Sequence, residues 1–264
     1  MNTTMKQTAI RIYNQLDGLN LALVSRWSAI AGQSIKERGE FHVALAGGKT
    51  PTRFYQLLAS KAIASTLPWS QTHIYFSDER CVAPDHADSN FHMAKDALLD
   101  HVPLPAQQIH RIRGEDPDHA QAAADYQQQL IRHLPADADG YHLDLVLLGL
   151  GTDGHIASLF PHTSILEERD ALVAAVTVEP RDRWRISMTF PLLEQARHVL
   201  IVVAGSDKAQ IIEDILGPDA VDHHYPAQRI EHLCEWHIDN EAADRLSPGF
   251  QARINDYYDQ NSGC

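Results

Sequence analysis

The segment LVLLGLGTDGHIASLFP, from Leu145 to Pro161, places an aspartate and a histidine directly after an apolar run and several glycines. A neutral imidazole at His155 is the form of histidine that accepts a proton as a general base. If His155 lies at the start of a helix, the positive end of the helix dipole disfavours its protonated form. Asp153 would then fix the tautomer of the ring or bind a substrate hydroxyl. An aspartate helix cap beside a histidine without a catalytic role is the alternative interpretation.

A second polar group, Asp78-Glu79-Arg80, follows the apolar run His73–Phe76. A carboxylate and a guanidinium this close together can orient a polar ligand and stabilise a developing oxyanion. A solvated charged turn is the alternative interpretation. The chain has no G-x-S-x-G motif, and Cys81 has no evident activating partner. The sequence therefore favours water activated by a base over covalent catalysis.

The stretch ALAGGKTP ends an apolar run in Gly47-Gly48-Lys49-Thr50. A nucleotide-binding P-loop requires a glycine five positions before its Gly-Lys-Thr, where this chain has Val43. The sequence therefore argues against a P-loop. Two glycines still let the backbone approach an anion closely, and the following helix directs free N–H groups toward it. A tight strand-to-helix turn with Pro51 near the helix start is the alternative interpretation.

Three further basic residues lie near predicted strands. Arg183 and Arg185 lead into one apolar run, and Lys208 lies in the first turn of a predicted helix. The helix dipole disfavours a lysine at that position, so an anion that it helps to bind explains it better than simple exposure. Together with Gly48 and Lys49, these residues would neutralise one phosphate.

The elements that position these groups follow from apolar runs that alternate with amphipathic segments. The predicted strands are Phe41–Leu45, His73–Phe76, Leu143–Leu148, Ala171–Val178, Arg185–Thr189, Val199–Ala204 and Glu235–Ile238. The predicted helices are Thr8–Lys36, Thr52–Ser60, Asn90–His101, His119–His133, Asp207–Leu216 and Asn240–Leu246. This alternation predicts an α/β Rossmann-like layered fold, with a mostly parallel central sheet flanked by helices. No long linker interrupts the chain, so residues 1–264 are predicted to form a single domain.

In such a sheet the ligand binds beyond the carboxyl ends of the strands. Polar residues and glycines cluster after four of the predicted strands, at Gly47–Thr50, Ser77–Arg80, Gly149–His155 and Gly205–Lys208. We therefore expect these four segments to form one site.

The composition limits the class of partner. A formal charge of −13 over 264 residues, without a Lys/Arg run, argues against nucleic acid as a partner. No apolar stretch reaches the length of a membrane span, and the first twenty residues lack a signal-peptide pattern. The three cysteines form no C-x-x-C pair, which indicates a reducing cytoplasm. The histidines are scattered apart from His223-His224, so no metal site is expected.

The ordered set of motifs resembles the 6-phosphogluconolactonases of the pentose phosphate pathway over nearly the whole chain. The motifs are ALAGGKTP, FSDERCV followed by DSNFHMA, LGLGTDGHIASLFP, RISMTFPLL, VAGSDKAQII, and the closing YPAQRI and CEWHIDNEAA. Glucosamine-6-phosphate deaminases share the superfamily. They usually have Asp-Glu-Tyr where this chain has Asp78-Glu79-Arg80, and Asn-Glu-Pro where this chain has the lactonase form Ser158-Leu159-Phe160-Pro161.

The resemblance implies hydrolysis of 6-phospho-D-glucono-1,5-lactone to 6-phosphogluconate without a metal or cofactor. His155 would activate water, Arg80 would stabilise the oxyanion, and Asp78 and Asp153 would hold hydroxyls or water. The phosphate would be bound by Gly47, Gly48, Lys49, Thr50, Arg185 and Lys208. Arg183 remains an alternative to Arg185, because Glu179-Pro180-Arg181 replaces the family's frequent Pro-Pro pair.

The implied partner is a small sugar phosphate lactone, acted on by a cytoplasmic monomer or homodimer. A deaminase and a non-catalytic sugar-phosphate sensor are the alternative functions.

Overall fold

The structure is a computed structural model, and it describes residues 9–138, 140–178, 183–218, 220, 221, 224–251 and 254. Its centre is a six-stranded parallel sheet with the strand order β1-β11-β10-β7-β2-β3. The strands are β1 (Ala9–Tyr13), β2 (Phe41–Leu45), β3 (Thr72–Phe76), β7 (Leu145–Leu148), β10 (Val199–Val203) and β11 (Cys234–Asp239). The predicted parallel sheet is thus confirmed.

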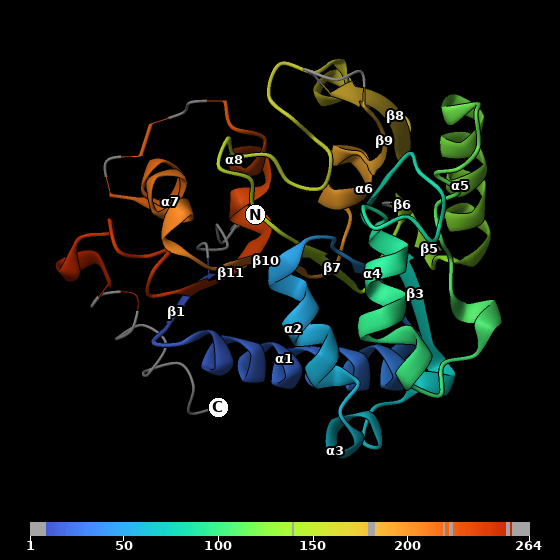
Figure 1. Cartoon of the computed structure of the whole chain (residues 1–264), viewed down its shortest axis with the longest axis horizontal. Helices are drawn as coiled ribbons and strands as arrows, with labels where there is room; N and C mark the ends of the chain where they lie inside the picture. The colour runs from blue at the N-terminus through green and yellow to red at the C-terminus, as the bar shows by residue number, and fades with distance from the viewer. Residues whose placement is uncertain are drawn as a thin grey trace.

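Helices cover both faces of this sheet. Figure 1 shows the strands between α1 on one side and α6, α7 and α8 on the other. The helices are α1 (Leu16–Arg38), α2 (Lys49–Leu58), α3 (Lys61–Ala64), α4 (Asn90–Ala97), α5 (His119–His133), α6 (Phe190–Glu194), α7 (Ala209–Leu216) and α8 (Pro226–Ile230). Every residue of β2, β7 and β10 is buried, as the nearly continuous apolar sequences of these strands predict for a sheet covered on both faces.

A smaller antiparallel sheet lies beside the central one. It has the order β4-β9-β8 and consists of β4 (Asp78–Arg80), β8 (Val173–Val178) and β9 (Arg183–Met188). Helix α5 packs over this sheet (Figure 1). A two-stranded ribbon joins β5 (Ala136–Asp137) to β6 (Gly140–Tyr141). The Asp78–Arg80 segment is therefore a short strand, and the interpretation of it as a charged turn is wrong.

Two predicted helices differ from the structure. The helix predicted from Thr8 begins only at Leu16, because Ala9–Tyr13 forms strand β1 against β11. Within AIRIY, the exposed Arg11 lies between Ile10 and Ile12, and this short alternation is the strand period. The helix predicted over Asn240–Leu246 is a series of turns. There the Asp239 carboxylate accepts hydrogen bonds from the backbone N–H of Ala242 (2.8 Å) and Gly205 (3.1 Å), which offers the backbone an alternative to helical pairing.

Among the described residues, no helix combines the length and the apolar character needed to cross a bilayer.

Candidate active site

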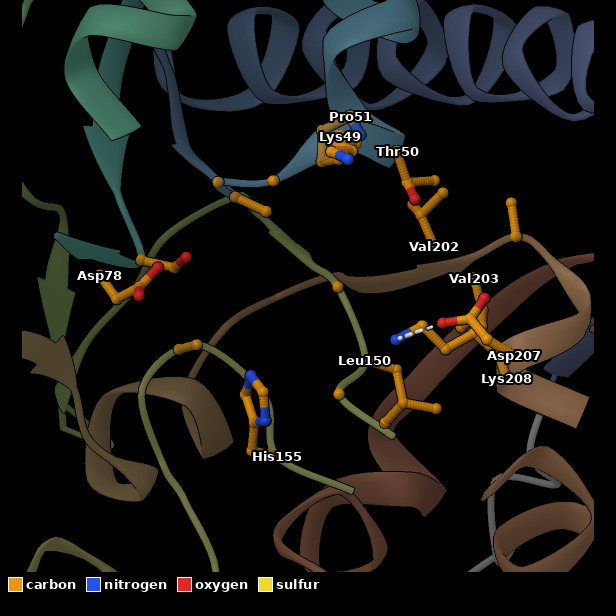
Figure 2. A pocket seen from close by; sticks show the side chains of 18 of the residues that line it. Lys49, Thr50, Pro51, Asp78, Leu150, His155, Val202, Val203, Asp207 and Lys208 are labelled. Carbon is orange, nitrogen blue, oxygen red and sulfur yellow. Dashed lines mark ion pairs between the residues drawn. The ribbon is translucent and has the colours of Figure 1, made fainter. Parts of the chain in front are cut away.

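A cavity of about 440 Å³ lies beyond the carboxyl ends of the parallel strands (Figure 2). It lies where the strand order reverses, because β3 is on one side of β2 while β7 and β10 are on the other. Residues from each of the four segments expected to form a site, or next to them, line this cavity. They are Ala46–Pro51, Ser77, Asp78, Arg80, Gly149–Gly151, His155, Ala157, Val202–Ala204, Asp207 and Lys208. The structure thus places the four strand ends around one cavity.

The glycine pair after β2 shapes one wall of the cavity. Gly48 caps the N-terminus of α2 with φ 97°, a backbone conformation that side chains larger than hydrogen disfavour. A Cβ on Gly47 would lie 1.9 Å from Oδ1 of Asn90, so only glycine fits against that side chain. The first turn of α2, with Lys49 and Thr50, lines the cavity. The free N–H groups of a helix N-terminus, combined with a lysine, favour an anion here.

His155 is held by the loop that follows β7, and Figure 2 shows its ring directed into the cavity. Nδ1 of His155 lies 2.6 Å from Oδ1 of Asp153, and because an ionised carboxylate carries no proton, Nδ1 is the donor. The pKa of Asp153 is lowered by this hydrogen bond. Nε2 of His155 then keeps a free lone pair. A Cβ on Gly151 would lie 2.0 Å from Nδ1 of His155, so glycine is required behind the ring.

His155 does not lie at the start of a helix, so the condition for a helix-dipole effect on its ring is not met. Residues 156–160 instead form a turn with a bridge between Ile156 and Leu159, and Ala157 has φ 47°. The ring of Phe160 packs on the imidazole, with ring centroids 4.0 Å apart and an angle of 31° between the planes. The Asp153 carboxylate and the Phe160 ring therefore orient His155.

Asp78 and Arg80 lie on β4 and face the cavity. The carboxylate of Asp78 is buried and accepts hydrogen bonds from Oγ of Ser158 (2.6 Å) and Nδ2 of Asn90 (3.1 Å). Nη1 of Arg80 donates to the backbone oxygen of Asp88 (2.7 Å). Both side chains are thus held by neighbouring segments before any ligand binds, which is the preorganisation that a site for a developing charge requires.

Glu79, between these two residues, points away from the cavity and is buried. Its carboxylate accepts hydrogen bonds from the backbone N–H of Arg80 (2.8 Å), Asn90 (2.7 Å) and Phe91 (2.8 Å) and from Oγ of Ser89 (3.0 Å). Burial raises the pKa of Glu79 even though these donors lower it. Glu79 therefore fixes the start of α4, which carries Asn90 to Gly47 and Asp78.

The predicted phosphate ligands do not all line the cavity. Lys49 and Lys208 do, and Nζ of Lys208 lies 3.5 Å from Oδ2 of Asp207 (Figure 2). Arg185 lies across the antiparallel pair from Arg80, and both residues line an adjoining cavity. Burial and the nearby charge of Arg80 lower the pKa of Arg185.

Sequence reasoning assigned no role to Asn90 and Ser158, which hold the Asp78 carboxylate. Both lie in motifs that carried the family resemblance, DSNFHMA and IASLFP. Their place in these motifs is the sequence feature that could have pointed to them. In the part of the chain that the structure describes, no group of three His, Cys, Asp or Glu side chains could hold a metal ion. His223, of the adjacent histidine pair, lies outside that part.

The chain is similar to known proteins in sequence and in structure. Residues 14–237 match the family described as glucosamine-6-phosphate isomerases/6-phosphogluconolactonase. The 6-phosphogluconolactonase of Nostoc sp. is 42% identical over 218 residues, covering 81% of this chain and 88% of the relative. The one of Synechocystis sp. is 40% identical over 220 residues, covering 82% and 89%. The solved 6-phosphogluconolactonase of Trypanosoma brucei is 26% identical with a TM-score of 0.80, covering 91% of this chain and 99% of the other.

Proposed function

Because the chain belongs to the glucosamine-6-phosphate isomerase/6-phosphogluconolactonase family, we propose that it hydrolyses 6-phospho-D-glucono-1,5-lactone to 6-phosphogluconate. One observation carries this proposal: His155, hydrogen-bonded to Asp153, faces the same cavity as Arg80 and two lysines. That set supplies a base, a cation for a developing oxyanion and charges for a phosphate.

The chemical step begins at Nε2 of His155, which takes a proton from a water molecule. The resulting hydroxide oxygen attacks the lactone carbonyl carbon, and the carbonyl oxygen becomes the oxyanion of a tetrahedral intermediate. Collapse of this intermediate breaks the bond from the carbonyl carbon to the ring oxygen. That oxygen leaves with the proton that His155 returns, so the histidine ends neutral as it began.

Arg80 stabilises the oxyanion in this proposal, because its guanidinium lines the cavity and β4 fixes its backbone. Asp78 orients a substrate hydroxyl or the attacking water. Asp153 holds the tautomer of His155 and stabilises the imidazolium that forms during the reaction. No step requires a metal or cofactor.

The phosphate is assigned to the opposite wall, which carries Gly47, Gly48, Lys49 and Thr50 at the start of α2, with Lys208 beside them. Free backbone N–H groups and two ammonium groups suit a phosphate dianion. We leave Arg185 out of this phosphate site, because it lines the adjoining cavity and not the one that Lys49 and Lys208 line.

Both activities of the family can be tested on one purified sample. The proposal predicts accelerated opening of 6-phosphogluconolactone, after subtraction of spontaneous opening, and no ammonia release from glucosamine 6-phosphate. Ammonia release without lactone opening would replace this function by the deaminase alternative, and binding of the sugar phosphate without either reaction would indicate a sensor.

We further propose a cytoplasmic monomer or homodimer, in line with a cysteine pattern typical of a reducing compartment. Sedimentation velocity would test the oligomeric state, since a stable larger species would contradict it.

A further inference from the structure

A second cavity, of about 560 Å³, lies next to the first and shares Arg80 with it. It opens over the strand pair β4–β9 and the start of α5, and its walls include Arg183, Trp184, Arg185 and His119. Its size falls in the range of small-molecule sites. The proposed lactone hydrolysis leaves every one of these side chains except Arg80 without a role.

The charge of this second cavity is opposite to that of the protein. Three guanidiniums, of Arg80, Arg183 and Arg185, face one carboxylate, of Asp88, in a chain with a formal charge of −13. Burial and the charges of Arg80 and Arg183 lower the pKa of Arg185, and the charge of Asp78 offsets this only in part. A cluster with this excess of positive charge attracts an anion, and guanidinium groups bind phosphate through paired N–H donors.

Most arginines elsewhere in the described part of the chain have a carboxylate partner. Examples are the ion pairs of Arg38 with Asp144 and of Arg111 with Glu115. Within the described residues, the three guanidiniums of the second cavity form none. Nε of Arg80 and Nδ1 of His119 are also buried without a hydrogen-bond partner among those residues. The second cavity is therefore lined by hydrogen-bond donors that lack the partners such groups usually have in a folded protein.

An aromatic surface stands beside these charges. The Trp184 side chain is 41% exposed, whereas Trp27, Trp69 and Trp236 are buried. The ring of His119 lies 5.2 Å from that of Trp184, centroid to centroid, at an interplanar angle of 46°. The backbone oxygen of Trp184 accepts hydrogen bonds from the N–H of Cys81 (3.2 Å) and from Nη1 of Arg185 (3.0 Å). The indole is thus carried on a fixed backbone with one side available for stacking.

We propose that this second cavity binds a nucleotide, whose base stacks on Trp184 and whose phosphates contact Arg183 and Arg185. An indole face accepts any nucleobase by stacking, and the adjacent guanidiniums supply the phosphate contacts. This site is separate from the glycine loop after β2, which lacks the P-loop glycine. Because Arg80 lines both cavities, a bound nucleotide slows lactone hydrolysis, and this consequence alone rests on the proposed function.

Direct binding tests the site without an activity assay. ATP is titrated into the full chain while tryptophan fluorescence is recorded, because Trp184 is the exposed indole and the other three are buried. Saturable quenching is expected, and it should persist in the presence of saturating 6-phosphogluconate. Adenosine and inorganic tripolyphosphate, titrated separately, should each bind at least about tenfold more weakly than ATP, because each provides only one half of the contacts.

Variants localise the binding by calorimetry. Trp184→Leu and Arg183→Ala should each weaken ATP binding about tenfold. Arg132→Ala is the matched control, since it removes the same charge from the far end of α5 and should bind ATP as the parent does. Arg183 is exposed, so its replacement keeps the test valid if Trp184→Leu fails to fold.

Three results would overturn the proposal. They are parental ATP affinity in both site variants, tripolyphosphate binding as tight as that of ATP, and complete displacement of ATP by 6-phosphogluconate. The last result would place the nucleotide in the catalytic cavity.

Discussion

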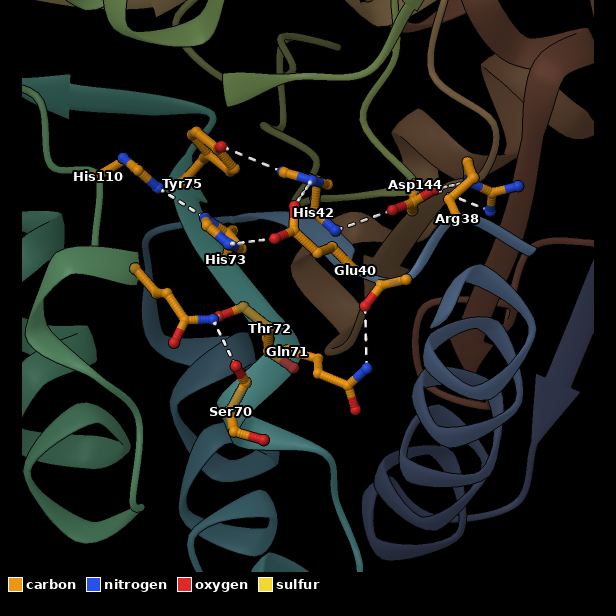
Figure 3. Close-up of polar contacts among 12 residues, drawn as sticks. Arg38, Glu40, His42, Ser70, Gln71, Thr72, His73, Tyr75, His110 and Asp144 are labelled. Atoms are coloured by element: carbon orange, nitrogen blue, oxygen red, sulfur yellow. Dashed lines mark hydrogen bonds and ion pairs between the residues drawn. The ribbon is translucent and has the colours of Figure 1, made fainter. Parts of the chain in front are cut away.

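Histidine side chains lie near carboxylates at both ends of the parallel sheet, but the two ends differ in how exposed these histidines are and in what they contact. At the carboxyl end, His155 faces a cavity with 28% of its side chain exposed and contacts one carboxylate. At the amino end, His42 and His110 are 1% exposed and contact other aromatic rings (Figure 3).

The polar groups at the amino end satisfy one another. Nδ1 of His42 lies 3.1 Å from the hydroxyl of Tyr75, and Nδ1 of His73 lies 3.0 Å from Nε2 of His110. The carboxylate of Glu40 lies 3.3 Å from Nε2 of His42 and 3.6 Å from Nε2 of His73 (Figure 3). These contacts join the side chains of His42, His73, Tyr75, His110 and Glu40 to one another.

The consequence is a difference in chemistry between residues of the same type. Burial lowers the pKa of His42 to about 4 and that of His110 to about 3, and it also lowers the pKa of His73. These rings stay neutral at neutral pH and pack as aromatic groups. His155 instead combines an open side with a carboxylate partner, which is what a general base requires. The environment, and not the residue type, separates the catalytic candidate from the structural histidines.

The largest expected loss of activity comes from adding one methyl group beside His155, at the carboxyl end of the parallel sheet. Gly151→Ala places a Cβ 2.0 Å from Nδ1 of His155 and must displace the ring. We expect kcat for lactone hydrolysis to fall about 10²–10⁴-fold, as for the loss of a positioned base. Gly32→Ala, on α1 and outside the cavity, is the control, because its Cβ meets nothing within 4 Å. Equal losses in both variants would show that His155 is not the affected group.

A smaller effect is expected at the phosphate wall. Lys208→Ala should weaken binding of 6-phosphogluconate by about 1.5–3 kcal/mol, the cost of a lost charged hydrogen bond. Arg185→Ala should weaken it less, since Arg185 lies outside the cavity. Calorimetry measures both, and Lys61→Ala, on α3, controls for the loss of one charge. A larger loss in Arg185→Ala than in Lys208→Ala would contradict this assignment and place Arg185 among the main phosphate ligands.

The smallest expected effect concerns stability at the amino end. In the unfolded chain, histidines become protonated as the pH falls below their ordinary pKa of about 6.5. In the folded protein, His42 and His110 resist protonation down to about pH 4 and 3. The contribution of these histidines to the free energy of unfolding should therefore be complete above about pH 6.5. Below that pH it should decline, by about 2 kcal/mol per such histidine at about pH 5.

Urea unfolding at pH 7 and pH 5 measures this decline. His110→Phe removes one titrating group and keeps an aromatic ring, so its loss of stability between the two pH values should be smaller than that of the parent. An equal loss in both proteins would mean that His110 does not contribute.

Sequence reasoning located the strands and the segments after them because buried parallel strands are nearly all apolar and end in glycines, as in LVLLGLG. It missed β1, whose five residues were absorbed into the following helix. Its assignment of Arg185 to the phosphate ligands stays a prediction, because Arg185 lines the cavity that adjoins the one lined by Lys49 and Lys208. The hydrogen bonds from Asn90 and Ser158 to Asp78 join segments far apart in the chain, so they emerge only from the fold.

Replacement of His155 by asparagine tests the central claim most directly. Asparagine has a similar size and retains some hydrogen bonding, but it cannot accept the proton from water. With spontaneous lactone opening subtracted, we expect His155→Asn to lower kcat about 10²–10⁴-fold while 6-phosphogluconate binds with parental affinity. A folded variant that hydrolyses the lactone at the parental rate would contradict the account, and the base would then have to be sought at Asp78 or Asp153.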